Sequence, residues 1–193
     1  MVLKDGQKGL RMKKRLINFI APSSSGKDYL MQKYLKANPN SRRVVTCTTR
    51  PMRPNEKNHV DYHFITDDEF DVLKLTGKLI EQREYHVADG SVWKYGCPYF
   101  IDEFCDEYVN VVDLKGLESI IRAYPDAEVV TYYVHVPEDI RRERAIKRGG
   151  FNEAEWERRL KADEEDFSEE KLAHLNDVLR QYGNPPIQYV NNY

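Results

Sequence analysis

The stretch LINFIAPSSSGKD, residues 16–28, decides how the rest of the sequence is interpreted. Its first six residues form an apolar run of strand length, which stops at a small polar cluster ending in Gly26-Lys27. A helix is expected next, because apolar residues recur at helical spacing between residues 30 and 35. The first unit of the chain is therefore predicted to be a strand, a turn and a helix.

The polar part of this stretch lies where a phosphate-binding loop would lie, directly after a strand and before a helix. Such a loop needs successive backbone N–H groups and a helix N-terminus facing an anion, with a lysine that reaches the outer phosphates. Ala21 and Asp28 stand where the usual pattern has Gly and Ser or Thr, so a plain strand-to-helix turn stays open as an alternative. The residues expected to surround the phosphates are Ser23, Ser24, Ser25, Gly26, Lys27 and Asp28.

Asp28 is the one candidate metal ligand. A Ser or Thr hydroxyl usually binds the Mg²⁺ that bridges the outer phosphates of a nucleotide, and a carboxylate is also a hard oxygen ligand. The carboxylate, however, adds negative charge beside the phosphates. The substitution either preserves Mg²⁺ binding through water or weakens it, and we expect it to be preserved.

Composition excludes several classes of protein. The chain has 193 residues with 30 basic and 32 acidic side chains and a net charge of −2, which argues against a broadly basic nucleic-acid-binding surface. Its apolar runs are far shorter than the roughly 18 residues that a membrane span needs, and no signal-like segment begins the chain. Three cysteines without a CxxC pair predict free thiols. We expect a cytoplasmic protein with neither membrane nor nucleic acid as a partner.

Strands and helices alternate along most of the chain. This alternation predicts an α/β fold, a mainly parallel sheet with helices on both faces. The later elements of the pattern are strands at residues 43–46, 108–112 and 129–136 and helices after Gly116, after Glu138 and from Glu153.

A small strand-rich insert interrupts the alternation before residue 97. Thr66 and Glu69 have the spacing of a capping box, which predicts a short helix ending near Leu75. The strands of the insert are expected at residues 60–65, 80–87 and 91–95, with a hairpin turn at residues 88–90.

Histidines in this insert could suggest a metal site. His59 and His63 are four residues apart, but in an extended strand they would lie about 13 Å from each other. We therefore expect neither to bind a metal or to act in catalysis.

The motifs together resemble the guanylate kinase family, whose members are P-loop nucleoside monophosphate kinases. Each motif alone is ordinary, but their order and spacing are specific, and they cover roughly residues 15–193. After the loop, the motifs are TTRPMRP at residues 48–54, VDYHF at 60–64, LIE at 79–81, Tyr95-Gly96, Val112-Asp113 with Gly116, Arg144, Arg148, Arg159 and residues 190–192.

The resemblance implies an acceptor site for GMP or dGMP. Arg50, Arg53, Tyr62 and Tyr95 would bind the acceptor phosphate, and Thr46, Glu81 and Asp113 would bind the rest of the nucleotide. Glu81 fits the chemistry of guanine, because N1–H and the exocyclic amine offer two adjacent donors to one carboxylate. Adenine has an acceptor at N1, so the same carboxylate would be left partly unpaired.

The resemblance also implies the donor site and the reaction. ATP would bind at residues 23–28 with Asn191 beside its adenine, and Mg²⁺ would accompany it. Lys27, Arg144, Arg148 and Arg159 would act in catalysis, since phosphoryl transfer depends on positioning and on neutralising charge. The chain would then phosphorylate GMP or dGMP at the expense of ATP.

The domain organisation follows from the same resemblance. A flexible basic extension is expected at residues 1–14, followed by one domain at residues 15–193. Within that domain we expect a P-loop NTPase-type core at residues 15–45, 98–137 and 167–193, an NMP-binding lobe at 46–97 and a helical lid at 138–166.

Two alternatives stay open because the chain departs from the family pattern. Val111 stands where the family has an acid, and Cys97 replaces a hydroxyl after Tyr95-Gly96. These departures, with Ala21 and Asp28, allow a binding module that has kept the fold and lost catalysis. They also allow a nucleoside monophosphate kinase with another acceptor base.

Overall fold

The structure is a computed structural model that describes residues 13–86 and 90–193. The predicted extension lies outside the described residues except for its last two positions, and the predicted hairpin turn lies outside them except for Gly90. Lys14 is joined to the sheet, because its carbonyl accepts a hydrogen bond of 2.9 Å from the N–H of Glu128.

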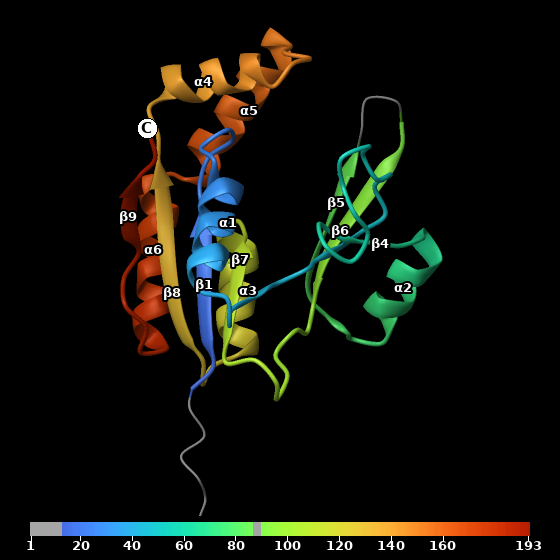
Figure 1. The fold of residues 1–193 in the computed structure, drawn as a ribbon, viewed down its shortest axis with the longest axis vertical. Coiled ribbons are helices and arrows are strands. Elements are labelled where there is room, and N and C mark those ends of the chain that lie inside the picture. The colour runs from blue at the N-terminus through green and yellow to red at the C-terminus, as the bar shows by residue number, and fades with distance from the viewer. Residues whose placement is uncertain (1–12, 87–89) are drawn as a thin grey trace, which may run out of the picture.

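The first sheet has five strands, all parallel (Figure 1). The central strand of this sheet, β1 (Arg15–Ile20), is followed by the loop of residues 21–26, so this loop lies at the carboxyl edge of the sheet. In spatial order the strands are β2 (Arg42–Arg43), β7 (Glu107–Val111), β1 (Arg15–Ile20), β8 (Glu128–His135) and β9 (Gln188–Asn191).

Helices cover both faces of this sheet, as the alternation predicts. Alternate residues of β1 enter different cores: Ile17 and Phe19 pack toward α1 (Lys27–Ala37), and Leu16 and Ile20 pack toward the other face. That other face is covered by α3 (Leu114–Ala123) and α6 (Glu169–Gln181). A parallel strand buried on both faces explains why the β1 sequence is almost continuously apolar.

The insert forms a second sheet with a helix beside it, seen as a separate lobe in Figure 1. Its helix α2 (Asp67–Leu75) begins with the predicted capping box between Thr66 and Glu69. The hairpin is confirmed, because its two long strands pair antiparallel. In spatial order the strands are β4 (His63–Phe64), β3 (Cys47–Thr48), β6 (Val92–Pro98) and β5 (Leu79–His86).

Two helices lie beyond the carboxyl edge of the first sheet (Figure 1). They are α4 (Glu138–Lys147) and α5 (Glu153–Asp166), and the break between them contains Gly149 and Gly150, both with positive φ. Within the described ranges, none of the helices combines the length and the apolar character that crossing a membrane would require.

Several predicted element boundaries are wrong, and the strand expected at 91–95 extends to Pro98. The strand expected at residues 43–46 is divided, since β2 ends at Arg43 on the edge of one sheet and β3 begins at Cys47 in the other. The strand expected at 60–65 shortens to β4. The helix expected after Gly116 already begins at Leu114, because the Asp113 side chain accepts the N–H of Gly116 and caps it.

The predicted separation of the histidines is also wrong. The Nδ1 atoms of His59 and His63 lie 2.8 Å apart. His59 has a φ of 63°, and the side chain of Asn58 accepts the N–H groups of both His59 and Phe64, which closes a turn where the sequence predicted a strand. Among the described residues, neither histidine belongs to a group of three or more side chains that could hold a metal ion.

Candidate active site

The loop between β1 and α1 has the conformation that an anion site needs. Gly26 is the residue before α1 and has a φ of 76°, and Ser24 has a φ of 61°. A Cβ at Gly26 would lie 2.7 Å from Nδ2 at the end of the Asn192 side chain, which would have to move, and the positive φ favours glycine in any case. Ser25 Oγ is buried and finds no partner in the part of the chain that the structure describes.

An ion pair from the lid holds this loop from one side. The carboxylate of Asp163 on α5 accepts the N–H of Ser23 at 2.9 Å and its hydroxyl at 3.1 Å. Asp163 also pairs with Arg141 on α4 at 3.1 Å, and Arg141 donates to the Ser23 carbonyl at 3.3 Å. Both charged side chains are largely buried, with 14% and 9% exposed. No sequence pattern pointed to either residue.

The residue that follows β9, Asn192, holds the loop from the other side. Asn192 Nδ2 donates to the Ser25 carbonyl at 2.9 Å. Arg144 on α4 reaches the same carbonyl at 3.3 Å and the Asn192 carbonyl at 2.6 Å. Asn191, which the resemblance assigned to the adenine, is exposed on β9. Its neighbour Asn192 is the residue that contacts the loop.

Lys27 lies at the start of α1, close to charges of both signs. Burial has the largest effect on the pKa of Lys27 and lowers it, while the charges of Asp28 and Asp163 raise it and the charges of Arg148 and Arg159 lower it. Because burial disfavours the charged form of a lysine, an anion bound at this loop would stabilise the Lys27 ammonium group.

The two predicted lid arginines differ in their partners. Arg159 Nε donates to Glu155 at 2.6 Å, and Arg158 pairs with the same carboxylate at 2.7 Å. Hydrogen bonds from these two guanidinium groups lower the pKa of Glu155 to about 2. Arg148 is exposed at the end of α4, and no acidic partner for it lies within the described ranges. Both arginines lie near enough to Lys27 to influence its pKa, but Arg159 is already paired with Glu155.

The predicted phosphate-binding arginines of the insert are held in different ways. Arg50 is 5% exposed, donates to Glu56 at 2.7 Å and to the Pro51 carbonyl at 2.7 Å, and its guanidinium lies 5.5 Å from the ring centroid of Phe64. Arg53 is exposed, and Glu56 accepts its backbone N–H at 2.8 Å. Glu56 therefore fixes this turn through both arginines, while the Arg53 side chain stays exposed to solvent.

The predicted tyrosines face each other on the insert. The rings of Tyr62 and Tyr95 meet edge to face with centroids 6.0 Å apart, and the Arg50 guanidinium lies 5.6 Å from the Tyr62 ring. Burial raises the pKa of Tyr62, so its hydroxyl keeps its proton and can donate. Thr46 lies on the connection between the two sheets, where its carbonyl accepts the N–H of His63.

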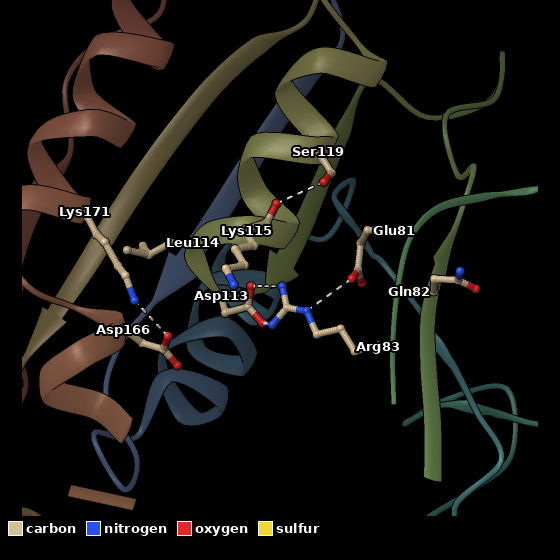
Figure 2. Close-up of a pocket in the computed structure, with 9 residues that line it drawn as sticks. All are labelled: Glu81, Gln82, Arg83, Asp113, Leu114, Lys115, Ser119, Asp166 and Lys171. Carbon is tan, nitrogen blue, oxygen red and sulfur yellow. Dashed lines mark hydrogen bonds and ion pairs between the residues drawn. The ribbon is translucent and has the colours of Figure 1, made fainter. Parts of the chain in front are cut away.

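A cavity of about 410 Å³ separates the insert from α3 and α6 (Figure 2). Ligand pockets commonly have volumes of roughly 300–1,000 Å³. Glu81 points into it from β5, and Asp113 faces it from the start of α3. Burial raises the pKa of Glu81, and the charge of Arg83 opposes that rise. The structure therefore brings Glu81, predicted to bind the base, and Asp113, predicted to bind the acceptor nucleotide, to one cavity.

Asp28 fits the requirements of a magnesium site. Its carboxylate is exposed in the first turn of α1, beside the loop. Mg²⁺ is usually held by one or two carboxylates together with waters and substrate phosphates, so a single carboxylate suffices. Among the described residues there is no group of three or more His, Cys, Asp and Glu side chains that could hold a metal without a nucleotide.

The fold and the site define a class of protein. A parallel sheet with a Gly-Lys loop after its central strand, opening a helix and approached by cationic side chains, is the arrangement of P-loop nucleotide-binding proteins. A sequence profile described as Guanylate kinase matches residues 13–92.

Curated relatives identify the family. The guanylate kinase of Thermotoga maritima is 35% identical over 150 residues, which covers 75% of this chain and 69% of the relative. That of Legionella pneumophila strain Lens is 31% identical over 173 residues, covering 88% and 74%. The chain belongs to the guanylate kinase family, and it is a nucleoside monophosphate kinase.

A solved structure supports the fold. The crystal structure of guanylate kinase from Anaplasma phagocytophilum matches with a TM-score of 0.53 and 23% identity, covering 88% of this chain and 87% of that one. The predicted α/β fold of the P-loop type is confirmed.

Proposed function

We propose that this chain transfers the γ-phosphoryl group of ATP to GMP or dGMP, releasing ADP and GDP or dGDP. The observation that carries the proposal is the position of Lys27 at the N-terminus of α1, near Arg148 and Arg159, together with a carboxylate in the cavity between insert and core. The first feature suits the phosphates of a donor nucleotide, and the second suits the donor edge of guanine. The guanylate kinase relatives support the same reaction.

The donor would be held mostly by backbone. The N–H groups of residues 24–28 and the N-terminus of α1 would surround the β- and γ-phosphates, and Lys27 would neutralise them. The N–H of Ser23 would join them only by leaving Asp163. Because Asp163 and Asn192 fix the loop from two sides, its amides are positioned before ATP arrives. Asn191 remains our proposed neighbour of the adenine, on the exposed edge beside Asn192.

The acceptor would be held mostly by side chains. Arg50, Arg53, Tyr62 and Tyr95 would donate to the phosphate of GMP, because planar guanidinium groups and phenol hydroxyls both suit phosphate oxygens. Glu81 would accept N1–H and the amine of guanine, and the Thr46 hydroxyl would lie beside the base. Exposed Arg53 is free to change conformation toward the phosphate, whereas Arg50 is already fixed.

Phosphoryl transfer would depend on bringing these two groups together. Lys27, Arg144, Arg148 and Arg159 would neutralise the charge that spreads over the transferred group. Arg159 would have to exchange Glu155 for phosphate, and closure of the lid helices would exclude water, whose attack would hydrolyse ATP. Asp28 would hold Mg²⁺ together with the phosphates, and the ion would supply further charge neutralisation.

A coupled assay tests the proposed function. The enzyme is incubated with ATP, Mg²⁺ and, separately, GMP, dGMP, AMP, CMP or UMP, and formation of ADP is followed. We expect turnover with GMP and dGMP and little with the other three. Turnover with AMP or a pyrimidine nucleotide but not with GMP would refute the base assignment. Turnover with none of the five would refute the kinase function.

A further inference from the structure

Arg83 occupies the cavity beside the base-binding acid, although no motif in the sequence pointed to it. It follows Glu81 by two residues on β5, so both side chains extend from the same face of the strand, while Gln82 points away (Figure 2). The Arg83 guanidinium forms a two-point ion pair with the Asp113 carboxylate. Its Nε lies 3.5 Å from a carboxylate oxygen of Glu81.

The guanidinium is fixed in place from the core side. Asp113 is itself held, because its Oδ1 accepts the N–H of Gly116 at 2.9 Å at the start of α3. The side chains of Arg83 and Glu81 are 25% and 19% exposed, so both lie in the cavity wall and not on the outer surface. A planar guanidinium that is held at two points by Asp113, the N-cap residue of α3, keeps one orientation. Asp113 is thus a positioning residue for Arg83.

Part of the hydrogen-bonding capacity of Arg83 remains unused. A guanidinium has five N–H groups. Two of them bind Asp113 and the Nε–H is directed toward Glu81, which leaves two with no acceptor among residues 13–86 and 90–193. The cavity wall therefore presents an acceptor, Glu81, next to a group that can only donate.

This order of groups matches one edge of guanine. Along that edge the amine and N1–H donate, and O6 and then N7 accept. A carboxylate followed by a guanidinium is complementary to donors followed by acceptors, and arginine is a common partner of the O6 and N7 atoms of guanine. Adenine has an amine in place of O6, so it would direct a donor at Arg83 and an acceptor at Glu81.

We propose that Arg83 is a specificity-determining residue that donates to O6 of the acceptor guanine while Glu81 binds N1–H and the amine. The inference rests on the proposed function, because it assigns a role within the acceptor site. It divides recognition of the base between two residues: Glu81 reads the donor half and Arg83 reads the acceptor half. Discrimination against adenine then has two sources.

The test compares acceptors that differ at single atoms. GMP is compared with 6-thio-GMP, in which a weakly accepting sulfur replaces O6, and with IMP, which lacks the amine. In the wild-type enzyme, kcat/KM should favour GMP over both analogues. Arg83→Met should lower kcat/KM for GMP by roughly ten- to a hundredfold and reduce the preference for GMP over 6-thio-GMP to near unity. The preference for GMP over IMP, which reports on Glu81, should change less than about threefold.

Two further variants separate recognition from folding. Arg122→Met removes an exposed arginine of α3 that pairs with Glu118 outside the cavity, and it should leave both preferences unchanged. Arg83→Lys keeps the positive charge for Asp113 and should fold even if Arg83→Met does not. Because an ammonium lacks the planar fork, we expect this variant to lose part of the preference over 6-thio-GMP.

The outcomes are distinguishable from a failure of the proposed function. If the wild-type enzyme phosphorylates no guanine nucleotide, the proposed function fails. If it phosphorylates GMP, but Arg83→Met and Arg83→Lys keep the wild-type preference over 6-thio-GMP, Arg83 only ties the insert to the core and the inference is overturned. A wild-type enzyme that does not distinguish GMP from 6-thio-GMP would overturn it as well.

Discussion

The proposed donor loop and the proposed acceptor lobe are built differently. The loop of residues 21–26 is shaped by backbone and is held by Asp163 on α5 and by Asn192, directly after β9. The lobe that we propose for the acceptor is shaped by side chains on short strands, and the pair of Arg83 and Asp113 joins it to the core at the cavity. A site made of backbone would depend less on residues such as Ala21 and Asp28, whereas a site made of side chains would change its specificity with each residue.

Removing the loop cation should have the largest effect. Lys27→Met leaves the backbone donors intact and removes the charge closest to the transferred group, so we expect kcat/KM to fall by about a thousandfold, at the upper end of the cost of losing one preorganised charge stabiliser. Steady-state kinetics with ATP and GMP measure it. Lys33→Met, on the exposed side of α1, is the matched control and should behave as wild type. A loss below about tenfold would contradict our account of the donor loop.

Changing the base-binding acid should have the next largest effect. Glu81→Gln replaces one acceptor with an amide donor that faces the donors of guanine, so kcat/KM for GMP should fall by about a hundredfold. Its thermal midpoint should move little. Glu84→Gln, on the opposite face of β5, serves as the control. Unchanged kinetics for Glu81→Gln would remove this residue from the acceptor site.

Breaking the tie that holds the loop should weaken stability and ATP binding together. Asp163→Asn leaves the nearly buried guanidinium of Arg141 without its counter-charge, and we expect a loss of about 3 kcal/mol in the free energy of unfolding. The KM for ATP should rise more than the KM for GMP, because Asp163 also binds Ser23. Urea unfolding and kinetics measure both. Glu157→Gln, exposed on the same helix, should change neither.

The smallest expected effect is the change in stability at acid pH that comes from Glu155 on α5. The folded-state pKa of Glu155 is about 2, below its ordinary value, because Arg158 and Arg159 donate to it. Its contribution to stability is therefore fully present above about pH 4.5 and is lost as the pH falls toward 2. As the pH falls through that interval, Glu155→Gln should lose less stability than the wild-type protein. Unfolding followed at each pH measures both losses. Parallel curves for the two proteins would contradict the assignment.

The sequence predicts more of the donor loop than of its supports. A strand, a Gly-Lys turn and a helix are contiguous, so local spacing was enough to find the loop. Asp163 and Arg141 lie 140 and 118 residues from Ser23, and nothing in an acidic run or a basic helix distinguishes the residues that turn inward. Their role depends on how the lid packs, which periodicity does not encode.

The insert was harder to predict for a related reason. Its strands β3 and β4 have two residues each, so alternation had too few positions to set their boundaries. The turn that joins His59 to His63 depends on the Asn58 side chain and on the positive φ of His59. The prediction of a strand at residues 60–65 took neither into account. Arg83 went unnoticed because its partner, Asp113, is 30 residues away.

The most direct test of the central claim is a calorimetric titration with adenosine and guanosine joined 5′ to 5′ through five phosphates. If one cleft holds both nucleotides with their phosphates facing, one linked dinucleotide should bind per protein chain. It should bind at least a hundredfold more tightly than ATP or GMP alone, because linking makes the second binding event intramolecular. Lys27→Met and Glu81→Gln should each weaken it. An affinity no greater than that of the tighter single nucleotide would show that the two sites do not face each other.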